Sequence, residues 1–240
     1  MNAKATACLL IVAAVLTNIA FTALGSVFNY PDVLDEPVRE VLADFRTSQR
    51  SIASWFLVLA LSAALFAPIA IGVGRLSPAR TMRVAVRVGI AAAAVQVVGL
   101  LRWPVLVPGY AADASSTDPA VARAAEDSFR TAHAVLGTAI GETSGYLLTA
   151  LWTVLVLVAV GRAYGGRWFR LLGGTAAVLI AAGVVSPLDV PGVDTANFVG
   201  YILWSVWLIA FGALILRDDR RGHPATRTPH ATRAPLAPAG

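Results

Sequence analysis

Long runs of uncharged residues alternate with short charged segments along this chain. Most runs reach or exceed the roughly 18–20 apolar residues with which an α-helix crosses a bilayer. The run 88–101 becomes long enough when Arg87 and Arg102 lie toward its two ends. None has the alternating pattern of a membrane β-strand. The uncharged runs cover residues 5–31, 51–74, 88–101, 143–161, 171–188 and 195–216.

This pattern predicts an all-α fold, a six-helix transmembrane bundle with an extracytoplasmic amphipathic helix. We expect a membrane domain over residues 1–216 and a disordered cytoplasmic tail over 217–240, where Arg, Pro and Thr replace apolar side chains. Alternatively, the first run is a cleaved secretory signal ending at Ala23-Leu24-Gly25, which leaves five spans. The expected spans lie near residues 7–28, 52–73, 84–107, 139–160, 171–190 and 197–216.

The basic residues predict which side of the membrane each loop faces. Lys and Arg concentrate in the cytoplasmic loops of membrane proteins. With the N-terminus inside, most of the 19 basic residues lie on the cytoplasmic side, and most of the 14 acids lie in the outer segments. Both termini are therefore expected in the cytoplasm. The basic residues placed inside are Lys4, Arg75, Arg80, Arg83, Arg87, Arg162, Arg167, Arg170, Arg217, Arg220, Arg221, Arg227 and Arg233.

The first outer segment, residues 34–50, predicts an amphipathic surface helix. Asp35 and Arg39 suit a favourable i, i+4 pair on its polar side, and Pro37 suits its first turn. The helix either caps the spans or binds a partner. Its apolar stripe consists of Leu34, Val38, Val41, Leu42 and Phe45.

The second outer segment, residues 108–130, predicts a further helix. Thr117 or Asp118 can cap it, and Pro119 fits its first turn. We expect this helix to continue into the fourth span.

Composition and charge add little chemistry to this picture. Hydrophobic residues make up 57% and charged residues 14%, which fits a membrane protein. The net charge of +5 follows from the inside loops, so it does not indicate nucleic-acid binding. The single cysteine, Cys8, lies at the inner end of the first span, so no disulfide is expected.

The motifs of the common enzyme and cofactor classes are missing from the sequence. It has no Walker loop, no G-x-S-x-G and no H-E-x-x-H. Two of its three histidines, His223 and His230, fall in the tail, so we expect neither a metal nor a cofactor. Nothing argues for an enzyme, and one acting on lipid is the least favoured interpretation.

Polar residues recur near the outer boundary of several spans, and they form the candidate site. We interpret them as an ion pair or as a small polar ligand cleft open to the outside. The alternative is an interfacial belt in which Glu142 reaches water and the aromatic rings anchor the helices. The candidates are Arg102, Trp103, His133, Glu142, Tyr146, Asn197 and Tyr201.

Glu142 stands beside a stripe of small residues at the start of the fourth span. Gly137, Gly141 and Gly145 recur every four residues, a pattern with which membrane helices approach closely. The depths of Glu142 and Arg102 in their expected spans differ by less than one helical turn. We therefore expect Arg102 to be the counter-ion, so that Glu142→Gln weakens the fold.

The segments "FRTAHAVLGTAIGETSGYLLTALWTVLV", "YPDVLDEP" and "RWPVLVP" resemble a bacterial family of small multi-pass membrane proteins known only as a domain of unknown function. The family is common in actinobacteria. The resemblance runs from the first to the sixth span and is strongest at Gly141-Glu142, Gly145 and Leu151-Trp152-Thr153. It implies a six-span protein of the bacterial plasma membrane and no particular activity.

Two functions therefore remain from the sequence. The favoured one is a membrane scaffold or accessory subunit, whose partners are the lipid bilayer and a second membrane protein or copy of this chain. It predicts a free apolar face at residues 137–145 or 34–45. The alternative is binding or transport of a small amphiphile, lipid or proton. It predicts a pocket holding Arg102, Glu142 and Tyr146.

Overall fold

The structure is a computed structural model that describes residues 2–220. Those residues form helices joined by short turns, and no strand occurs among them. The helices are α1 Ala3–Phe28, η1 Asp32–Asp35, α2 Val38–Thr47, α3 Gln49–Ala64, α4 Phe66–Gly74, α5 Arg80–Val105, α6 Val107–Asp113, α7 Pro119–Ala132, η2 His133–Ser144, α8 Gly145–Tyr164, α9 Gly166–Ala182, η3 Gly183–Leu188 and α10 Val193–Arg220.

The described residues contain six helical stretches that are long and apolar enough to cross a membrane, as the sequence predicts. Several stretches join two or three helices end to end. Residues 217–220 belong to α10 and not to a tail, and the rest of the expected tail lies outside the described residues. The stretches are Ala3–Phe28, Gln49–Gly74, Arg80–Asp113, Pro119–Tyr164, Gly166–Leu188 and Val193–Arg220.

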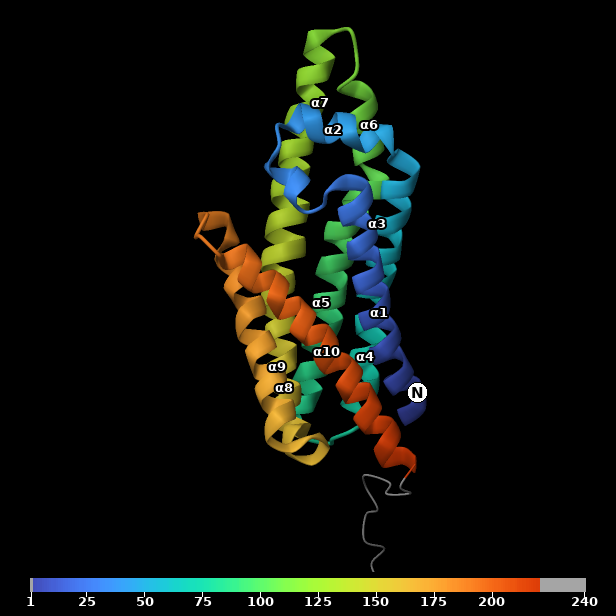
Figure 1. Cartoon of the computed structure of the whole chain (residues 1–240), viewed down its shortest axis with the longest axis vertical. Coiled ribbons are helices and arrows are strands. Elements are labelled where there is room, and N and C mark those ends of the chain that lie inside the picture. The colour runs from blue at the N-terminus through green and yellow to red at the C-terminus, as the bar shows by residue number, and fades with distance from the viewer. Residues whose placement is uncertain (1, 221–240) are drawn as a thin grey trace, which may run out of the picture.

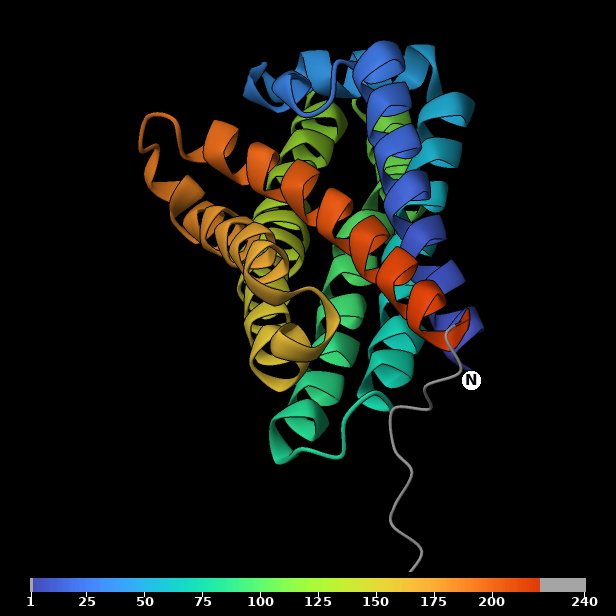
Figure 2. The ribbon, with the colours of Figure 1, turned by 60° about the horizontal axis from the view of Figure 1, so that its bottom comes forward.

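The membrane helices follow one another around the bundle in chain order. The α3–α4 stretch packs between α1 and α5, and η2 and α8 pack on the other side of α5. Next comes α9 against α8, and α10 contacts both α9 and α1. Figures 1 and 2 show α10 crossing the bundle obliquely from α9 to the N-terminal helix. The last helix thus closes the ring on the first.

Large apolar side chains on the outside of the ring suit a lipid environment. Val158 on α8 is 70% exposed, and Val178 on α9 is 69% exposed. Burying such side chains in an apolar medium is favourable, whereas water would penalise them. The buried core near the start of α1 and the end of α10 instead consists of aromatic and aliphatic side chains, among them Trp152, Trp207 and Phe211.

A second core lies at the opposite end of the bundle, which holds α2, α6 and α7 and is here called the α2 end (Figure 1). Trp103 of α5 is its centre and is fully buried. The Phe56 ring stacks on it at 4.7 Å between centroids, and Phe28 meets it edge-on at 5.2 Å. Trp103 is therefore a core residue and not part of an interfacial belt.

The amphipathic surface helix exists, but it is shorter than the sequence suggested. It covers Val38–Thr47, with Val41, Leu42 and Phe45 buried and Glu40 exposed. The expected register is therefore confirmed. The helix begins late because the residue before a proline is disfavoured in the α region. Glu36 accordingly has extended backbone angles, φ −78° and ψ 159°, and Asp35 belongs to η1.

The second expected helix is confirmed, with Asp118 as its N-cap. The Asp118 carboxylate accepts a hydrogen bond from the Ala120 backbone N–H at 2.8 Å. Pro119 occupies the first turn, where its missing N–H costs nothing. From there the chain stays helical through α7, η2 and α8 to Tyr164, a stretch of 46 residues.

Candidate functional site

Glu142 lies in an unusual segment, because η2 is a π-helix of 12 residues. Backbone hydrogen bonds in π-helices run from i to i+5, and such turns are rare and frequent at functional sites. The Ser144 hydroxyl follows the same spacing and donates to the carbonyl of Ala139 at 2.9 Å. The segment therefore departs from regular α-helix at the point where the acid enters the membrane bundle.

The glycine stripe of η2 and α8 packs against α5 within the same chain. A Cβ added to Gly141 would lie 3.0 Å from the Gly99 Cα, so the two backbones touch. Gly137 faces the Arg102 guanidinium in the same way, and Gly145 faces Gln96. Contacts therefore recur every four residues along η2 and α8 and every three residues along α5, which is a common form of helix packing.

Arg102 is 4% exposed, and atoms of its own chain hold its guanidinium. Nη1 donates to the Gly99 carbonyl at 2.6 Å, and Nη2 lies 3.2 Å from Nδ1 of His133. Because a guanidinium carries only donors, Nδ1 accepts, which fixes the neutral imidazole with its proton on Nε2. The buried Arg102 Nε has no hydrogen-bond partner in the described part of the chain, and the guanidinium carbon lies 5.3 Å from the centroid of the Trp103 ring.

The expected direct ion pair between Arg102 and Glu142 is not formed. No oxygen of Glu142 lies within 4.0 Å of a basic nitrogen in the described part of the chain. The two groups still act on each other electrostatically. His133 holds the contact that the sequence assigned to Glu142. The half-buried carboxylate has no hydrogen bond or ion pair to residues 2–220.

Three tyrosines lie within electrostatic range of the Glu142 carboxylate. Tyr146 and Tyr201 meet edge-on at 5.8 Å between ring centroids. Tyr30 enters from the turn after α1. Burial raises the pKa of its phenol to about 12, the charge of Glu142 adds to the rise, and Arg102 opposes it. Tyr30 is therefore a neutral hydroxyl at physiological pH.

We refer to Tyr30, Arg102, His133, Glu142, Tyr146 and Tyr201 as the Glu142 cluster. The Tyr146 hydroxyl, like the acid, has no hydrogen bond to the described residues. Two half-buried polar groups with free hydrogen-bonding capacity thus lie beside a buried, fixed positive charge. Such an arrangement can exchange a proton or receive a small polar group.

The family model for Domain of unknown function (DUF4386) matches residues 5–212. The chain belongs to this family. No curated protein matches the chain, and no solved structure does. The DUF4386 match extends from the first membrane helix into the last, and it includes the π-helical segment and the aromatic core around Trp103. The family description assigns no activity, so we infer the function from the geometry of the residues.

Asn197, one of the candidates predicted from the sequence, makes a hydrogen bond that does not involve Glu142. Its Nδ2 donates to the Ile180 carbonyl at 2.9 Å and packs against Gly183. This contact joins α10 to α9 where α9 passes into η3. Asn197 therefore bonds to the helix backbone and is not a free group of the Glu142 cluster.

Tyr30 and Gln96 are polar residues of this region that were not predicted from the sequence. Tyr30 follows the first span directly, at the same boundary as Arg102 and Glu142, and this shared level is the signal that identifies it. Gln96 precedes Arg102 by six residues on α5, and its Nε2 donates to the Thr149 hydroxyl oxygen at 3.1 Å. No group of three or more His, Cys, Asp or Glu side chains gathers within residues 2–220.

Proposed function

We propose that this membrane protein binds a small ligand or a proton at the Glu142 cluster, with the Glu142 carboxylate as the accepting group. The observation that carries the proposal is that this carboxylate, inside a membrane-spanning stretch, has no hydrogen bond or ion pair to residues 2–220. A charged side chain within a bilayer costs a few kcal/mol, so such residues normally pair or serve a ligand or ion pathway.

Arg102 does not relieve this cost by direct contact. Its Nη1 and Nη2 atoms bond to the Gly99 carbonyl and to His133, and its buried Nε has no partner among the described residues. It therefore provides a fixed positive charge near Glu142 without occupying the oxygens of the carboxylate. Those oxygens remain open to a proton or to a donor group on a ligand, and the Tyr146 hydroxyl lies within the same cluster.

A scaffold or accessory subunit was the other function supported by the sequence. Its partner was expected on the glycine stripe or on the stripe of α2. Gly137, Gly141 and Gly145 pack against α5, and Val41, Leu42 and Phe45 are buried in the aromatic core. Neither surface is free for a second protein, which favours the binding function.

Mass spectrometry of molecules that purify with the full-length protein tests the proposal. We expect a small molecule or lipid that is present with wild type and lost with Glu142→Gln. Glu126→Gln is the matched control, because Glu126 lies on α7 of the same helical stretch and pairs with Arg130 at 3.5 Å.

For a proton, the readout is the infrared carboxyl signal that titrates in wild type and disappears in Glu142→Gln. Equal retention of every bound molecule by both variants, with no titrating carboxyl assigned to Glu142, would refute the proposal. A stoichiometric membrane-protein partner in its place would favour the scaffold.

A further inference from the structure

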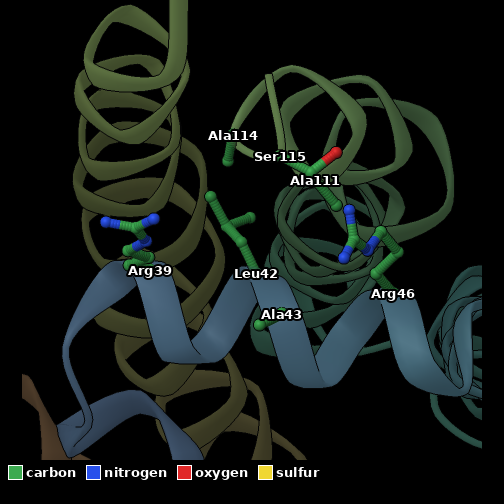
Figure 3. Close-up of a pocket in the computed structure, with 7 residues that line it drawn as sticks. All are labelled: Arg39, Leu42, Ala43, Arg46, Ala111, Ala114 and Ser115. Atoms are coloured by element: carbon green, nitrogen blue, oxygen red, sulfur yellow. The ribbon is translucent and has the colours of Figure 1, made fainter. Parts of the chain in front are cut away.

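A cavity of about 270 Å³ lies between α2 and α6, and no residue of the Glu142 cluster lines it (Figure 3). Arg39 and Arg46 of α2 border it, with Leu42 between them. Ala111 and Ser115, at and just beyond the end of α6, lie across from them. The cavity thus combines two basic side chains with an apolar wall.

Helical spacing explains why the two arginines share this cavity. Arg39, Leu42 and Arg46 stand at positions i, i+3 and i+7, which fall on one face of a helix. Two turns separate the arginines, or roughly 10 Å along the axis at 1.5 Å per residue. Leu42 is anchored in the core, so α2 holds the arginine backbones in place. Figure 3 shows the two guanidinium groups on either side of Leu42.

Neither guanidinium group has an acidic partner within residues 2–220. No carboxylate lies within 4.0 Å of Arg39 or Arg46 among the described residues, and no acid lines the cavity. The pair expected between Asp35 and Arg39 is not formed, because Asp35 belongs to η1 and lies outside α2. Two like charges around one concave surface raise the local potential, which attracts an anion.

We propose that this cavity binds a phosphate or carboxylate anion, carried by a small soluble molecule or by a lipid headgroup. The planar fork of arginine donors matches both anions, and charge-assisted hydrogen bonds are the stronger kind. The volume lies just below the range of about 300–1,000 Å³ typical of small-molecule pockets. It fits a headgroup or a small metabolite and leaves an acyl chain outside. Leu42 and Ala111 accommodate the carbon part of the ligand.

Two probes distinguish the sources of the anion. Calorimetric titration of the full-length protein with inorganic phosphate, in a neutral detergent, tests for a soluble anion. For a headgroup, native mass spectrometry counts the phosphatidylglycerol that the protein retains from nanodiscs mixed with phosphatidylcholine. Binding of either probe at one site per chain is the expected result, and binding of neither overturns the proposal.

Four variants assign the binding to this cavity. Arg39→Gln and Arg46→Gln should each weaken binding about tenfold, because each removes charge-assisted hydrogen bonds. Arg50→Gln is the matched control, since Arg50 is exposed nearby and does not line the cavity. Ser115→Phe should abolish binding by filling the space from the other wall, without changing the charge.

Equal loss in Arg50→Gln, or full binding by Ser115→Phe, would show general surface charge and overturn the proposal. Both arginines are exposed, so their variants should elute and melt like wild type. Glu142→Gln should leave this binding unchanged. Failure at this cavity and failure at the Glu142 cluster are therefore separate results.

Discussion

Arg102 places its Nη2 atom 3.2 Å from Nδ1 of His133, although His133 lies on a different helical stretch and carries no negative charge. The contact joins α5 to the first residue of the π-helical segment. It supplies an acceptor to a buried cation at a place where an ion pair was expected. Glu142 is thereby left with free oxygens.

Removal of that acceptor should destabilise the bundle. His133→Leu leaves a buried donor of Arg102 unpaired, which costs about 1–3 kcal/mol of the free energy of unfolding. His133→Gln retains an acceptor and should lose less. Denaturant unfolding in detergent, followed by circular dichroism, measures the difference. A His133→Leu variant as stable as wild type would mean that the contact has no structural weight.

The close backbone contact between α5 and η2 should make the stability of the bundle sensitive to added side-chain atoms there. Gly99→Ala should lower the free energy of unfolding by about 1–3 kcal/mol. Its Cβ would lie 2.6 Å from the Gly141 Cα, and a backbone atom cannot change rotamer to relieve the clash. Gly174→Ala on α9 is the control. A Cβ there meets nothing within 4 Å, so the variant should gain about 0.5–1 kcal/mol of helix stability. Similar melting of the two variants would contradict the packing.

The six membrane helices could be predicted from the sequence because a bilayer imposes length and apolarity locally. The 12-residue π-helix could not, since glycines such as Gly137 and Gly141 fit an α-helix equally well. The hydrogen-bond partner of a buried cation depends on how each helix is rotated about its axis. The depth of Arg102 was therefore predictable, whereas its contact with His133 was not.

Only some residues of the site could be predicted from their position near the membrane boundary. Glu142 and Tyr146 were identified because they interrupt or border an apolar run. Tyr30 was missed because aromatic residues at a helix end usually anchor it at the interface. The cavity bordered by Arg39 and Arg46 depends on how α2 packs against α6. A local sequence pattern does not reveal that packing.

The helix α2 should depend on the aromatic core for its position. Phe45 is fully buried, 6.0 Å from Trp103 between ring centroids. Phe45→Ala should therefore lower the free energy of unfolding by about 3–5 kcal/mol, as measured by denaturant unfolding in detergent. Asp44→Ala changes the neighbouring exposed residue and should stay within about 0.5 kcal/mol of wild type. Comparable losses in the two variants would argue against the register of α2.

The distribution of basic residues predicts that the α2 end faces outward and both chain termini face inward. Cysteines introduced within residues 113–117, in a background with Cys8 replaced, should react with an impermeant maleimide added to intact cells. Cysteines within residues 223–226 should react only after the membrane is opened. Labelling of the second set from outside would reverse the topology.

The stability of Glu142→Gln, compared with ligand-stripped wild type in detergent, tests the central claim most directly. An unpartnered carboxylate makes no bond that folding needs, so the variant should unfold within about 0.5 kcal/mol of wild type, or be more stable. Breaking a buried ion pair instead costs about 3–5 kcal/mol. A loss of that size in Glu142→Gln would show that the acid is the structural counter-ion of Arg102 and not a binding group.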